Sequence, residues 1–466
     1  MTVHFIGICG TAMATLAALY KRRGHTVRGS DAHVYPPMSD FLADEGIDVF
    51  DGFRAEQITA DVDLVIVGNA ISRGNVELEA VLDRKQRYCS LPEAIRDQFL
   101  WDRRSVVIAG THGKTTTTSL VASVLADAGR DPSALIGGIC ANFGSSYRLG
   151  AGREFVIEGD EYDSAYFDKT AKFLKYLPDI AVVGNVEFDH ADIYADLDAI
   201  LLAFSRFLRL VPRNGLTVLG VDSEHVEALR PHVKSRVVTV GLSAGADWRA
   251  HDVRSVDGLT VFEVSHAGQG WGTIQTTLLG VHNVRNILAT IAVAADVGVD
   301  TAAIIAGVRA FRGVKRRMEL RGEAQGVRVY DDFAHHPTAI RETLAGVRAA
   351  HPASRIWGIF EPRSATSCRR VFQDEFSTAF DSVDEAILAA VFRANLPDDQ
   401  RLSGEAVVAG INARGTRARL IPTVPEIVTS VAAEARAGDL VVIMSNGGFE
   451  GIHDKLLAAL GARVAG

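Results

Sequence analysis

Cysteine is scarce in this chain, and both a basic surplus and a long hydrophobic run are absent. The four cysteines form no C-x-x-C pair, so neither a zinc site nor a disulfide framework is expected. Lys and Arg number 49 against 57 Asp and Glu, a net charge of −8 that argues against general nucleic-acid binding. The chain has no basic N-terminal region followed by an apolar run, and no stretch of about 18 apolar residues. We therefore expect a cytoplasmic protein without a signal peptide or a membrane span.

The remaining composition is that of a globular protein of several domains. At about 150 residues per domain, 466 residues suggest roughly three domains. Strand–turn–helix patterns begin near residues 3, 105 and 326, and composition shifts place linkers near 100–104 and 313–317. We predict domains at residues 1–102, 103–313 and 314–466. Short apolar runs alternating with helical periodicity predict α/β domains with parallel sheets.

Buried strands and helices can be placed in each domain. The central domain also contains strand-prone stretches between residues 248 and 279 with turns but no long helix, which predicts a small antiparallel sheet at the edge of the parallel one. Helices are expected at 13–20, 282–297, 302–311, 339–350 and 425–437. Strands are expected at 3–8, 25–31, 63–70, 105–110, 155–158, 180–185, 216–221, 237–240, 327–333, 356–360, 386–390, 419–421 and 440–444.

The clearest motif is Gly110-Thr-His-Gly-Lys114-Thr115-Thr, which joins a buried strand to a helix. Backbone N–H groups of such a turn, together with the helix N-terminus, bind phosphate oxygens. Lys114 would contact the β- and γ-phosphates of ATP, and the Thr115 hydroxyl would contact Mg²⁺. The full P-loop spacing needs glycine at position 108, where this chain has Ile108. The motif therefore predicts a shortened P-loop, although a chance Gly-Lys-Thr in a strand–helix turn has the same letters.

Two clusters of polar residues follow other buried strands of the central domain. Glu158 and Glu161 end or follow the strand at 155–158, and His190 lies between acids after the strand at 180–185. Ligands of α/β sheets bind at the carboxyl ends of the strands, and Mg²⁺ prefers oxygen ligands. One of these carboxylates could complete a Mg·ATP site. A solvated acidic loop and a structural histidine are the alternatives.

The hinge region and the start of the third domain carry further candidates. Asn283 and Asn286 lie one helical turn apart, so their amides could read a base edge or simply cap the helix. Arg317 lies in a basic segment that could equally be a linker. Asp332 and His335 follow the first strand of the third domain, where they could contact ribose, metal or substrate.

Taken in order, these motifs resemble the Mur ligase superfamily over nearly the whole chain. HFIGICGT, VIEGDEYDSAYFDK, FEPRS and MSNGGFEGIH are most similar to its tripeptide-adding branch. The resemblance implies a Rossmann-like N-terminal UDP-sugar-binding domain, a central P-loop ATPase domain and a Rossmann-like C-terminal domain for the amine substrate. It implies an ATP- and Mg²⁺-dependent ligase of peptidoglycan recycling. That ligase joins L-alanyl-γ-D-glutamyl-meso-diaminopimelate to the carboxylate of UDP-N-acetylmuramate through an acyl phosphate.

The resemblance also implies roles for individual residues. Catalysis would involve Lys114, Glu161, His190 and Arg317, and Mg²⁺ would be held by Thr115, Glu161 and His190. The ATP-binding residues would be Gly110, Thr111, His112, Gly113, Lys114, Thr115, Thr116, Asn283, Asn286, Arg317 and Asp332. The other substrates would be bound by Gly7, Gly10, Thr11, Asp31, Ala70, Ile71, His335 and Arg363.

Two differences from the general Mur ligase pattern bear on which branch of the family the sequence resembles. No lysine occurs between Lys175 and Lys234, so the carbamylated lysine of several Mur ligases has no candidate, as expected for the alanine-adding and tripeptide-adding branch. Arg363 stands where the alanine-adding branch shows a His-Arg pair, and its guanidinium could bind the tripeptide's carboxylates or simply lie at the surface. An L-alanine-adding ligase, an NAD-dependent oxidoreductase and a nucleotide-gated binding protein are the alternatives. The missing third glycine of a dinucleotide fingerprint disfavours the oxidoreductase, because residue 13 is Met13.

Overall fold

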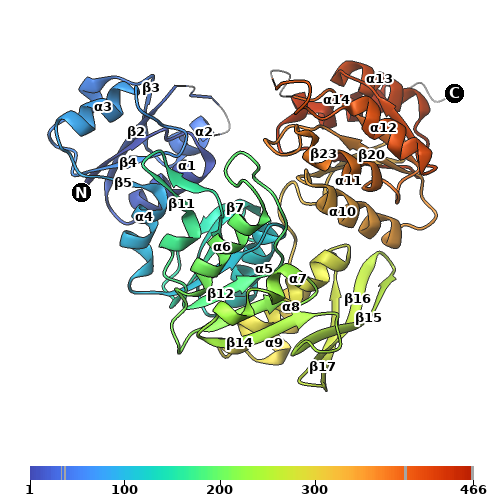
Figure 1. The fold of residues 1–466 in the computed structure, drawn as a ribbon, viewed down its shortest axis with the longest axis horizontal. Coiled ribbons are helices and arrows are strands. Elements are labelled where there is room, and N and C mark those ends of the chain that lie inside the picture. The colour runs from blue at the N-terminus through green and yellow to red at the C-terminus, as the bar shows by residue number, and fades with distance from the viewer. Residues whose placement is uncertain (33, 36–37, 393–395, 463–466) are drawn as a thin grey trace.

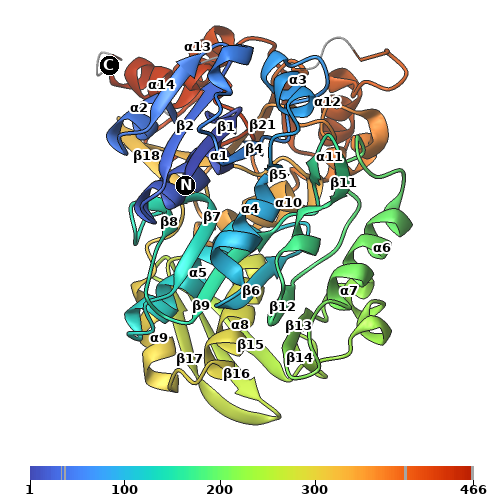
Figure 2. The ribbon, with the colours of Figure 1, turned by 90° about the vertical axis from the view of Figure 1, so that its left-hand side faces the viewer.

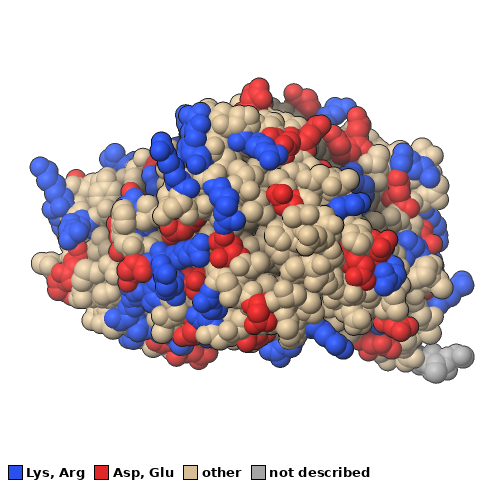
Figure 3. Space-filling model, turned by 90° about the horizontal axis from the view of Figure 1, so that it is seen from below, with Lys and Arg blue, Asp and Glu red and all other residues tan. Residues whose placement is uncertain are grey.

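The computed structural model describes residues 1–32, 34–35, 38–392 and 396–462. Three sheets follow one another along the chain, and the first and last lie side by side above the central one (Figures 1 and 2). Basic and acidic side chains are interspersed on the face shown in Figure 3, with Lys and Arg more frequent toward its left. In the part of the chain that the structure describes, we find no helix long and apolar enough to cross a bilayer.

The N-terminal sheet has five parallel strands, and the apolar side chains of its central strands β1 and β4 are mostly buried. Each loop from a strand to the next helix leaves the same edge of this sheet, so the turn after β1 lies beside the ends of β2 and β4. In sheet order the strands are β3 (Asp48–Asp51), β2 (Thr26–Asp31), β1 (Thr2–Ile6), β4 (Leu64–Val67) and β5 (Tyr88–Ser90). The helices are α1 (Thr11–Arg22), α2 (Met38–Asp44), α3 (Val76–Asp83) and α4 (Leu91–Ile95).

The central sheet has ten strands, with a parallel middle and antiparallel strands at both edges. In order these are β17 (Gln269–Thr276), β16 (Leu259–His266), β15 (Trp248–Val256), β14 (Arg236–Gly241), β13 (Leu216–Gly220), β12 (Ile180–Val183), β6 (Arg104–Ala109), β9 (Glu154–Gly159), β7 (Ser133–Cys140) and β8 (Ser145–Arg148). A separate hairpin pairs β10 (Asp163–Ala165) with β11 (Asp168–Ala171). The helices are α5 (Lys114–Asp127), α6 (Leu197–Leu208), α7 (Glu224–Glu227), α8 (Val281–Asp296) and α9 (Thr301–Ala310).

The C-terminal sheet has six strands, all parallel except the first. In order they are β18 (Glu319–Ala324), β19 (Val327–Asp332), β23 (Leu440–Met444), β20 (Ile356–Phe360), β21 (Glu385–Leu388) and β22 (Arg417–Leu420). The helices are α10 (Pro337–Ala350), α11 (Gln373–Thr378), α12 (Gly404–Ala413), α13 (Val424–Glu434) and α14 (Ile452–Gly461).

The α/β fold class predicted from the sequence is confirmed, including the antiparallel strands between residues 248 and 279. These strands extend the central sheet, because β15 also pairs in parallel with β14. Sequence reasoning missed the β7–β8 and β10–β11 pairs as well as α6, α12 and α14. The glycine pair Gly137–Gly138 interrupts the apolar pattern of β7, which explains why that strand escaped notice.

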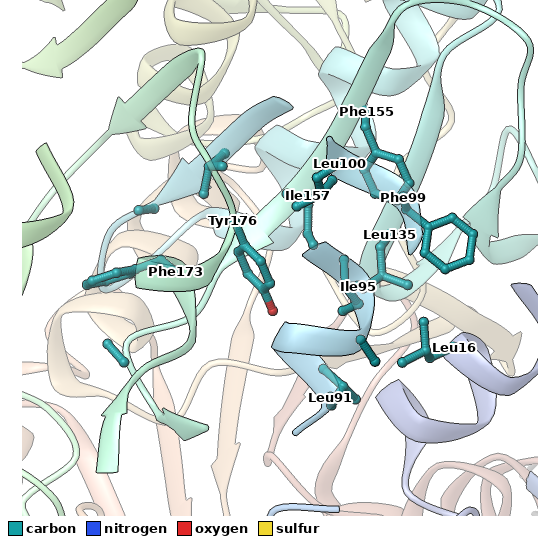
Figure 4. Close-up of a cluster of buried hydrophobic side chains, with 14 of the residues drawn as sticks. Leu16, Leu91, Ile95, Phe99, Leu100, Leu135, Phe155, Ile157, Phe173 and Tyr176 are labelled. Atoms are coloured by element: carbon teal, nitrogen blue, oxygen red, sulfur yellow. The ribbon is translucent and has the colours of Figure 1, made fainter. Parts of the chain in front are cut away.

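One hydrophobic core is shared by the first two sheets (Figure 4). Phe99 and Leu100, which precede the predicted boundary at residue 102, pack with Phe155 and Ile157 of β9. The rings of Phe99 and Phe155 lie 6.1 Å apart. The buried apolar residues of the C-terminal sheet form two clusters of their own on its two faces. The N-terminal and central parts therefore form one packed block, to which the C-terminal part is joined by more polar contacts.

Candidate active site

The shortened P-loop joins β6 to α5 in a backbone conformation that requires glycine. Gly110 and Gly113 have φ of +135° and +82°, a region that other residues rarely adopt. Space is also limiting, because a Cβ at Gly113 would lie 2.5 Å from the side-chain oxygen of Asn286, and one at Gly110 would lie 2.9 Å from the Asn185 carbonyl. The turn therefore presents the N-terminus of α5, with its N–H groups not yet used by the helix, to one point in space.

Lys114, Glu161 and His190 form a buried charged triad at the carboxyl end of the sheet. The Lys114 Nζ donates to the Gly110 carbonyl at 2.8 Å and to the two carboxylate oxygens of Glu161 at 2.9 and 3.0 Å. The His190 Nε2 lies 3.0 Å from the Glu161 Oε1. These residues follow β6, β9 and β12, which are adjacent in the sheet in the order β12-β6-β9. The sheet order thus explains how three motifs far apart in the sequence meet.

Thr115 is the second meeting point of the site. Its hydroxyl donates to the Glu158 Oε2 at 3.1 Å, and the Arg317 Nη2 lies 3.5 Å from the Thr115 hydroxyl oxygen itself. The backbone N–H of Gly137 in β7 donates to the other oxygen of Glu158. The acidic motif therefore brings two carboxylates to the P-loop, Glu158 beside Thr115 and Glu161 beside Lys114, where the sequence analysis favoured Glu161 alone.

The pKa values of Lys114, Glu161 and Glu158 are set by burial and by neighbouring charges. Burial lowers the pKa of Lys114, but Glu161, Asp160 and Glu158 outweigh it, so the net pKa is raised. Burial raises the pKa of Glu161, but Lys114 and His190 outweigh it, so the net pKa is lowered. Burial and the charge of Asp160 raise the pKa of Glu158 to about 7. Lys114 and Glu161 are therefore held as an ion pair, while Glu158 takes up and releases a proton near neutral pH.

The donors of this cluster fit a magnesium ion with bound nucleotide. The Thr115 hydroxyl and the Glu158 and Glu161 carboxylates are hard oxygen ligands, and His190 adds an imidazole within contact of Glu161. Mg²⁺ typically takes one or two protein carboxylates and completes its shell with phosphate and water. Glycine at position 137 leaves the space that the Glu158 carboxylate occupies, because a Cβ there would lie 2.9 Å from it.

A cavity of about 1760 Å³ connects the site with all three sheets. Its walls include Thr11, His190 and His335, each from a different predicted domain. The other predicted nucleotide-binding residues on its walls are Thr111, His112, Gly113, Lys114, Thr115, Thr116, Asn283, Asn286, Arg317 and Asp332. Such a cavity is large enough for several substrates at once.

Hydrogen bonds already engage some of these predicted residues. Asn283 donates to the Leu279 carbonyl at 2.7 Å and accepts from Asn286 at 3.1 Å. Asp332 accepts from the N–H groups of Met318 and Ala334, both at 2.8 Å, so it also holds the hinge loop beside Arg317. The assignments to adenine and ribose remain predictions.

The remaining predicted substrate residues lie at two other places. Gly7, Asp31 and Ile71 meet at the carboxyl edge of the N-terminal sheet: a Cβ at Gly7 would touch Ile71, and Asp31 accepts from the Cys9 N–H at 2.9 Å. Gly10 precedes α1 at the same edge, and Ala70 belongs to the turn after β4. Their proposed contact with a UDP-sugar remains a prediction.

Arg363 follows β20 in the C-terminal sheet, where it is held above Gly447. A Cβ at Gly447 would lie 2.2 Å from its Nε, so only glycine leaves room for this side chain. Its guanidinium carbon lies 3.7 Å from the Phe392 ring centroid, and its Nη1 lies 3.4 Å from Glu361. The side chain is therefore oriented by contacts on several sides, while 30% of it stays exposed.

Sequence reasoning missed residues that hold the site together. The Asn185 side chain accepts from the His112 N–H at 2.8 Å and donates to its carbonyl at 3.0 Å, fixing the P-loop from β12. Arg285 on α8 links Asp222 to Glu342 of α10, with both contacts at 2.9 Å. The position of Asn185 directly after a buried strand was a usable signal, but the Arg285 bridge depends on domain packing that no local pattern reveals.

Three family models match the chain in succession. They are described as "Mur ligase family, catalytic domain" at residues 2–99, "Mur ligase middle domain" at 108–294 and "Mur ligase, glutamate ligase domain" at 316–447. The chain belongs to the Mur ligase family, whose members are ATP-dependent, Mg²⁺-requiring ligases that form amide bonds. The P-loop, the acidic cluster and the hinge arginine described above lie within the middle and C-terminal matches.

Individual members of this family are similar to the chain over nearly its whole length. The chain is 41% identical over 462 residues to the UDP-N-acetylmuramate–L-alanyl-γ-D-glutamyl-meso-2,6-diaminoheptandioate ligase of Escherichia coli (strain K12), covering 99% of this chain and 98% of that one. A crystal structure of a murein peptide ligase from Psychrobacter arcticus 273-4 is 38% identical, with a TM-score of 0.73 and full coverage of both chains. The UDP-N-acetylmuramate–L-alanine ligase of Agrobacterium fabrum (strain C58) is 37% identical over 454 residues, covering 96% and 94%.

Proposed function

We propose that the chain joins L-alanyl-γ-D-glutamyl-meso-diaminopimelate to the carboxylate of UDP-N-acetylmuramate in peptidoglycan recycling. The observation that carries this proposal is the buried triad of Lys114, Glu161 and His190, because Lys114 and His190 line a cavity that Thr11 and His335 also line. The names of the two relatives that are 41% and 38% identical support the tripeptide as the amine. ATP and a nucleotide-linked sugar as substrates place the reaction in the cytoplasm.

The first step is attack of the muramate carboxylate on the γ-phosphate of ATP, which gives an acyl phosphate and ADP. This reaction needs positioning and neutralisation of charge more than covalent chemistry from the protein. The P-loop N–H groups and Lys114 would hold the phosphates, and Arg317 would reach them from the hinge beside Thr115. Thr115, Glu161 and His190 would hold Mg²⁺, which neutralises charge on the phosphates when bound.

The second step is attack of the tripeptide's α-amine on the acyl carbon, followed by collapse of the tetrahedral intermediate to amide and phosphate. The amine must lose a proton to react. Burial lowers the pKa of His335, so its imidazole is neutral at pH 7. Its Nδ1 lies 3.0 Å from the Phe333 carbonyl, which leaves the Nε2 lone pair to accept that proton.

The outer parts of the chain would bind the two organic substrates. We assign residues 1–102 to the UDP-sugar, with Gly7, Gly10 and Thr11 at its diphosphate, and residues 314–466 to the amine. Arg363 would pair with a carboxylate of the tripeptide through its two-pronged guanidinium. Its orientation by Phe392 and Glu361 supports this role, because a guanidinium fixed in advance loses less entropy on binding.

L-Alanine is the second candidate amine, because an alanine-adding ligase is 37% identical over most of the chain. Phosphate release with UDP-N-acetylmuramate, ATP and either amine separates the two, with mass spectrometry of the product. We expect kcat/KM for the tripeptide to exceed that for L-alanine by about 100-fold or more, because L-alanine lacks the D-glutamyl and diaminopimelate carboxylates that Arg363 would pair. Equal or greater turnover with L-alanine would refute the tripeptide assignment.

A further inference from the structure

Two histidines and a glutamate from separate segments meet where the central and C-terminal sheets face each other. His112 lies in the P-loop, Glu187 follows β12, and His336 directly precedes α10. The Glu187 Oε2 lies 3.2 Å from the His112 Nε2 and 3.5 Å from the His336 Nδ1. One ligand atom from each residue lies within 4.8 Å of the others. This cluster shares no residue with the Thr115, Glu161 and His190 set.

The two separations that involve Glu187 match those of ligands around one small tetrahedral ion, and the two histidine ligand atoms lie within 4.8 Å of each other. Zn²⁺ binds imidazole nitrogen and carboxylate oxygen at about 2.0–2.2 Å, so two of its ligands lie roughly 3.3–3.5 Å apart. The two contacts of Glu187, at 3.2 and 3.5 Å, fall at that spacing. Two histidines and one carboxylate are also a ligand set that zinc sites use, with a fourth position left for water or substrate.

The orientation of His336 favours a cation at this point. Its Nε2 lies 3.2 Å from the Phe188 carbonyl, which can only accept, so the proton belongs on Nε2 and the lone pair on Nδ1. That lone pair accepts from the Thr338 N–H, and the Glu187 Oε2 lies 3.5 Å from the same nitrogen, so a cation between nitrogen and oxygen would be attracted by both. Metal-bound histidines have this same second contact, a ring N–H donated to a backbone carbonyl. The Thr338 N–H lies 3.3 Å from Nδ1, a long contact that a metal bond would replace.

The charged groups around Glu187 also favour a bound cation. Within the residues that the structure describes, its ion-pair partners are His112 and His336 alone, with no Lys or Arg within 4.0 Å. Only a third of its side chain is exposed. Its carboxylate also has hydrogen bonds with the His112 ring and the Thr338 side chain, and a cation bound beside these groups would add the permanent positive charge that no Lys or Arg provides here.

We propose that His112, Glu187 and His336 form a binding site for a transition-metal ion of the Zn²⁺ type, distinct from the magnesium of ATP. Imidazole nitrogens select such an ion over Mg²⁺, which prefers oxygen. Because His112 belongs to the P-loop and His336 to the C-terminal domain, a bound ion would fasten these two parts together. The ion would thereby restrain the movement of the amine-binding domain during turnover.

Cobalt binding to the full chain tests this site without using activity. Co²⁺ is titrated into the nucleotide-free protein in saturating Mg²⁺, so that the oxygen sites stay filled, and the visible absorption of four-coordinate Co²⁺ is recorded. We expect one equivalent to bind and Zn²⁺ to displace it. Glu187→Gln and His336→Ala should each weaken binding by more than about 100-fold, since even loss of an outer-shell partner costs 10–100-fold.

His251→Ala is the matched control, because His251 also lies beside a carboxylate, 3.1 Å from Asp252, but belongs to no group of three candidate metal ligands among the residues that the structure describes. This variant should bind Co²⁺ as the wild type does. Circular dichroism establishes that each variant is folded, and Glu187→Gln keeps the size of the side chain if His336→Ala does not fold. The proposal is overturned if the wild type shows no saturable four-coordinate spectrum, or if a folded Glu187→Gln variant keeps wild-type affinity.

Discussion

Replacing Lys114 with alanine should abolish turnover while leaving binding of UDP-N-acetylmuramate nearly unchanged. The Lys114 ammonium lies 2.9–3.0 Å from Glu161 and 2.8 Å from the Gly110 carbonyl, at the point where the P-loop would present nucleotide phosphates. The predicted UDP-sugar residues Gly7 and Asp31 lie at the edge of another sheet, in contacts that do not involve Lys114. The substitution therefore removes charge from the reacting groups and leaves the sugar site intact.

Two magnitudes follow from this geometry. Removing one partner of a buried ion pair destabilises a protein by about 3–5 kcal/mol, and the lower end applies here because His190 stays 3.0 Å from Glu161. Removing one pre-organised donor to the charge that develops on the transferring phosphoryl group raises the activation free energy by about 2.7–4 kcal/mol. This corresponds to a fall in kcat of roughly 100- to 1,000-fold. The loss of activity should therefore persist at temperatures where the variant is fully folded.

The assay is phosphate release under saturating substrates, with calorimetric titration of UDP-N-acetylmuramate and a thermal melt on the same preparation. Lys455→Ala on α14 is the control, because that side chain is half exposed and 3.9 Å from its nearest carboxylate; its effect should stay within about 0.5 kcal/mol. A folded Lys114→Ala variant with kcat within tenfold of wild type would refute the placement of ATP at this loop.

Three other substitutions test separate parts of the structure. Arg363→Ala should raise KM for the tripeptide about tenfold or more and leave KM for ATP unchanged, by steady-state kinetics; equal effects would remove its proposed role. Burial raises the pKa of Asp222, but Ser243, the Leu242 N–H and Arg285 outweigh it, so its net pKa is lowered; its stabilisation is fully present above pH 3.8 and is lost as the pH falls from there through the lowered folded-state pKa. Asp222→Asn should thus cost about 1–2 kcal/mol in urea unfolding at pH 7, and the cost should shrink progressively as the pH is lowered below 3.8; a pH-independent cost would contradict this. Phe99→Ala should lower the free energy of unfolding by about 3–5 kcal/mol, since its ring is 1% exposed; a loss under 1 kcal/mol would mean that the shared core contributes little.

Local sequence signals were sufficient to find the P-loop. Its glycines, its lysine and the flanking strand and helix are consecutive in the chain, so a local pattern is enough to recognise such a turn. The strands of the parallel sheets were also predictable, because both of their faces are buried and they read as continuous apolar runs.

Contacts between distant segments were not predictable in the same way. The sequence does not state that β9 and β12 flank β6, so it cannot show that Glu158 reaches Thr115 while Glu161 reaches Lys114. Nor does any local pattern pair Glu187 with His336, since that contact exists only when two sheets face each other. These parts of the site depend on tertiary packing.

The hydrophobic core shared by the first two sheets limits where the chain can be divided. A break near residue 102 would leave Phe99 and Leu100 on one fragment and Phe155 on the other, so both fragments would carry exposed apolar surface and tend to aggregate. A break near residue 315 separates parts whose main cores are distinct. Of these two positions, we therefore expect only the break near residue 315 to give two fragments that fold. The C-terminal fragment could then be added separately, and activity would depend on the concentration of that fragment.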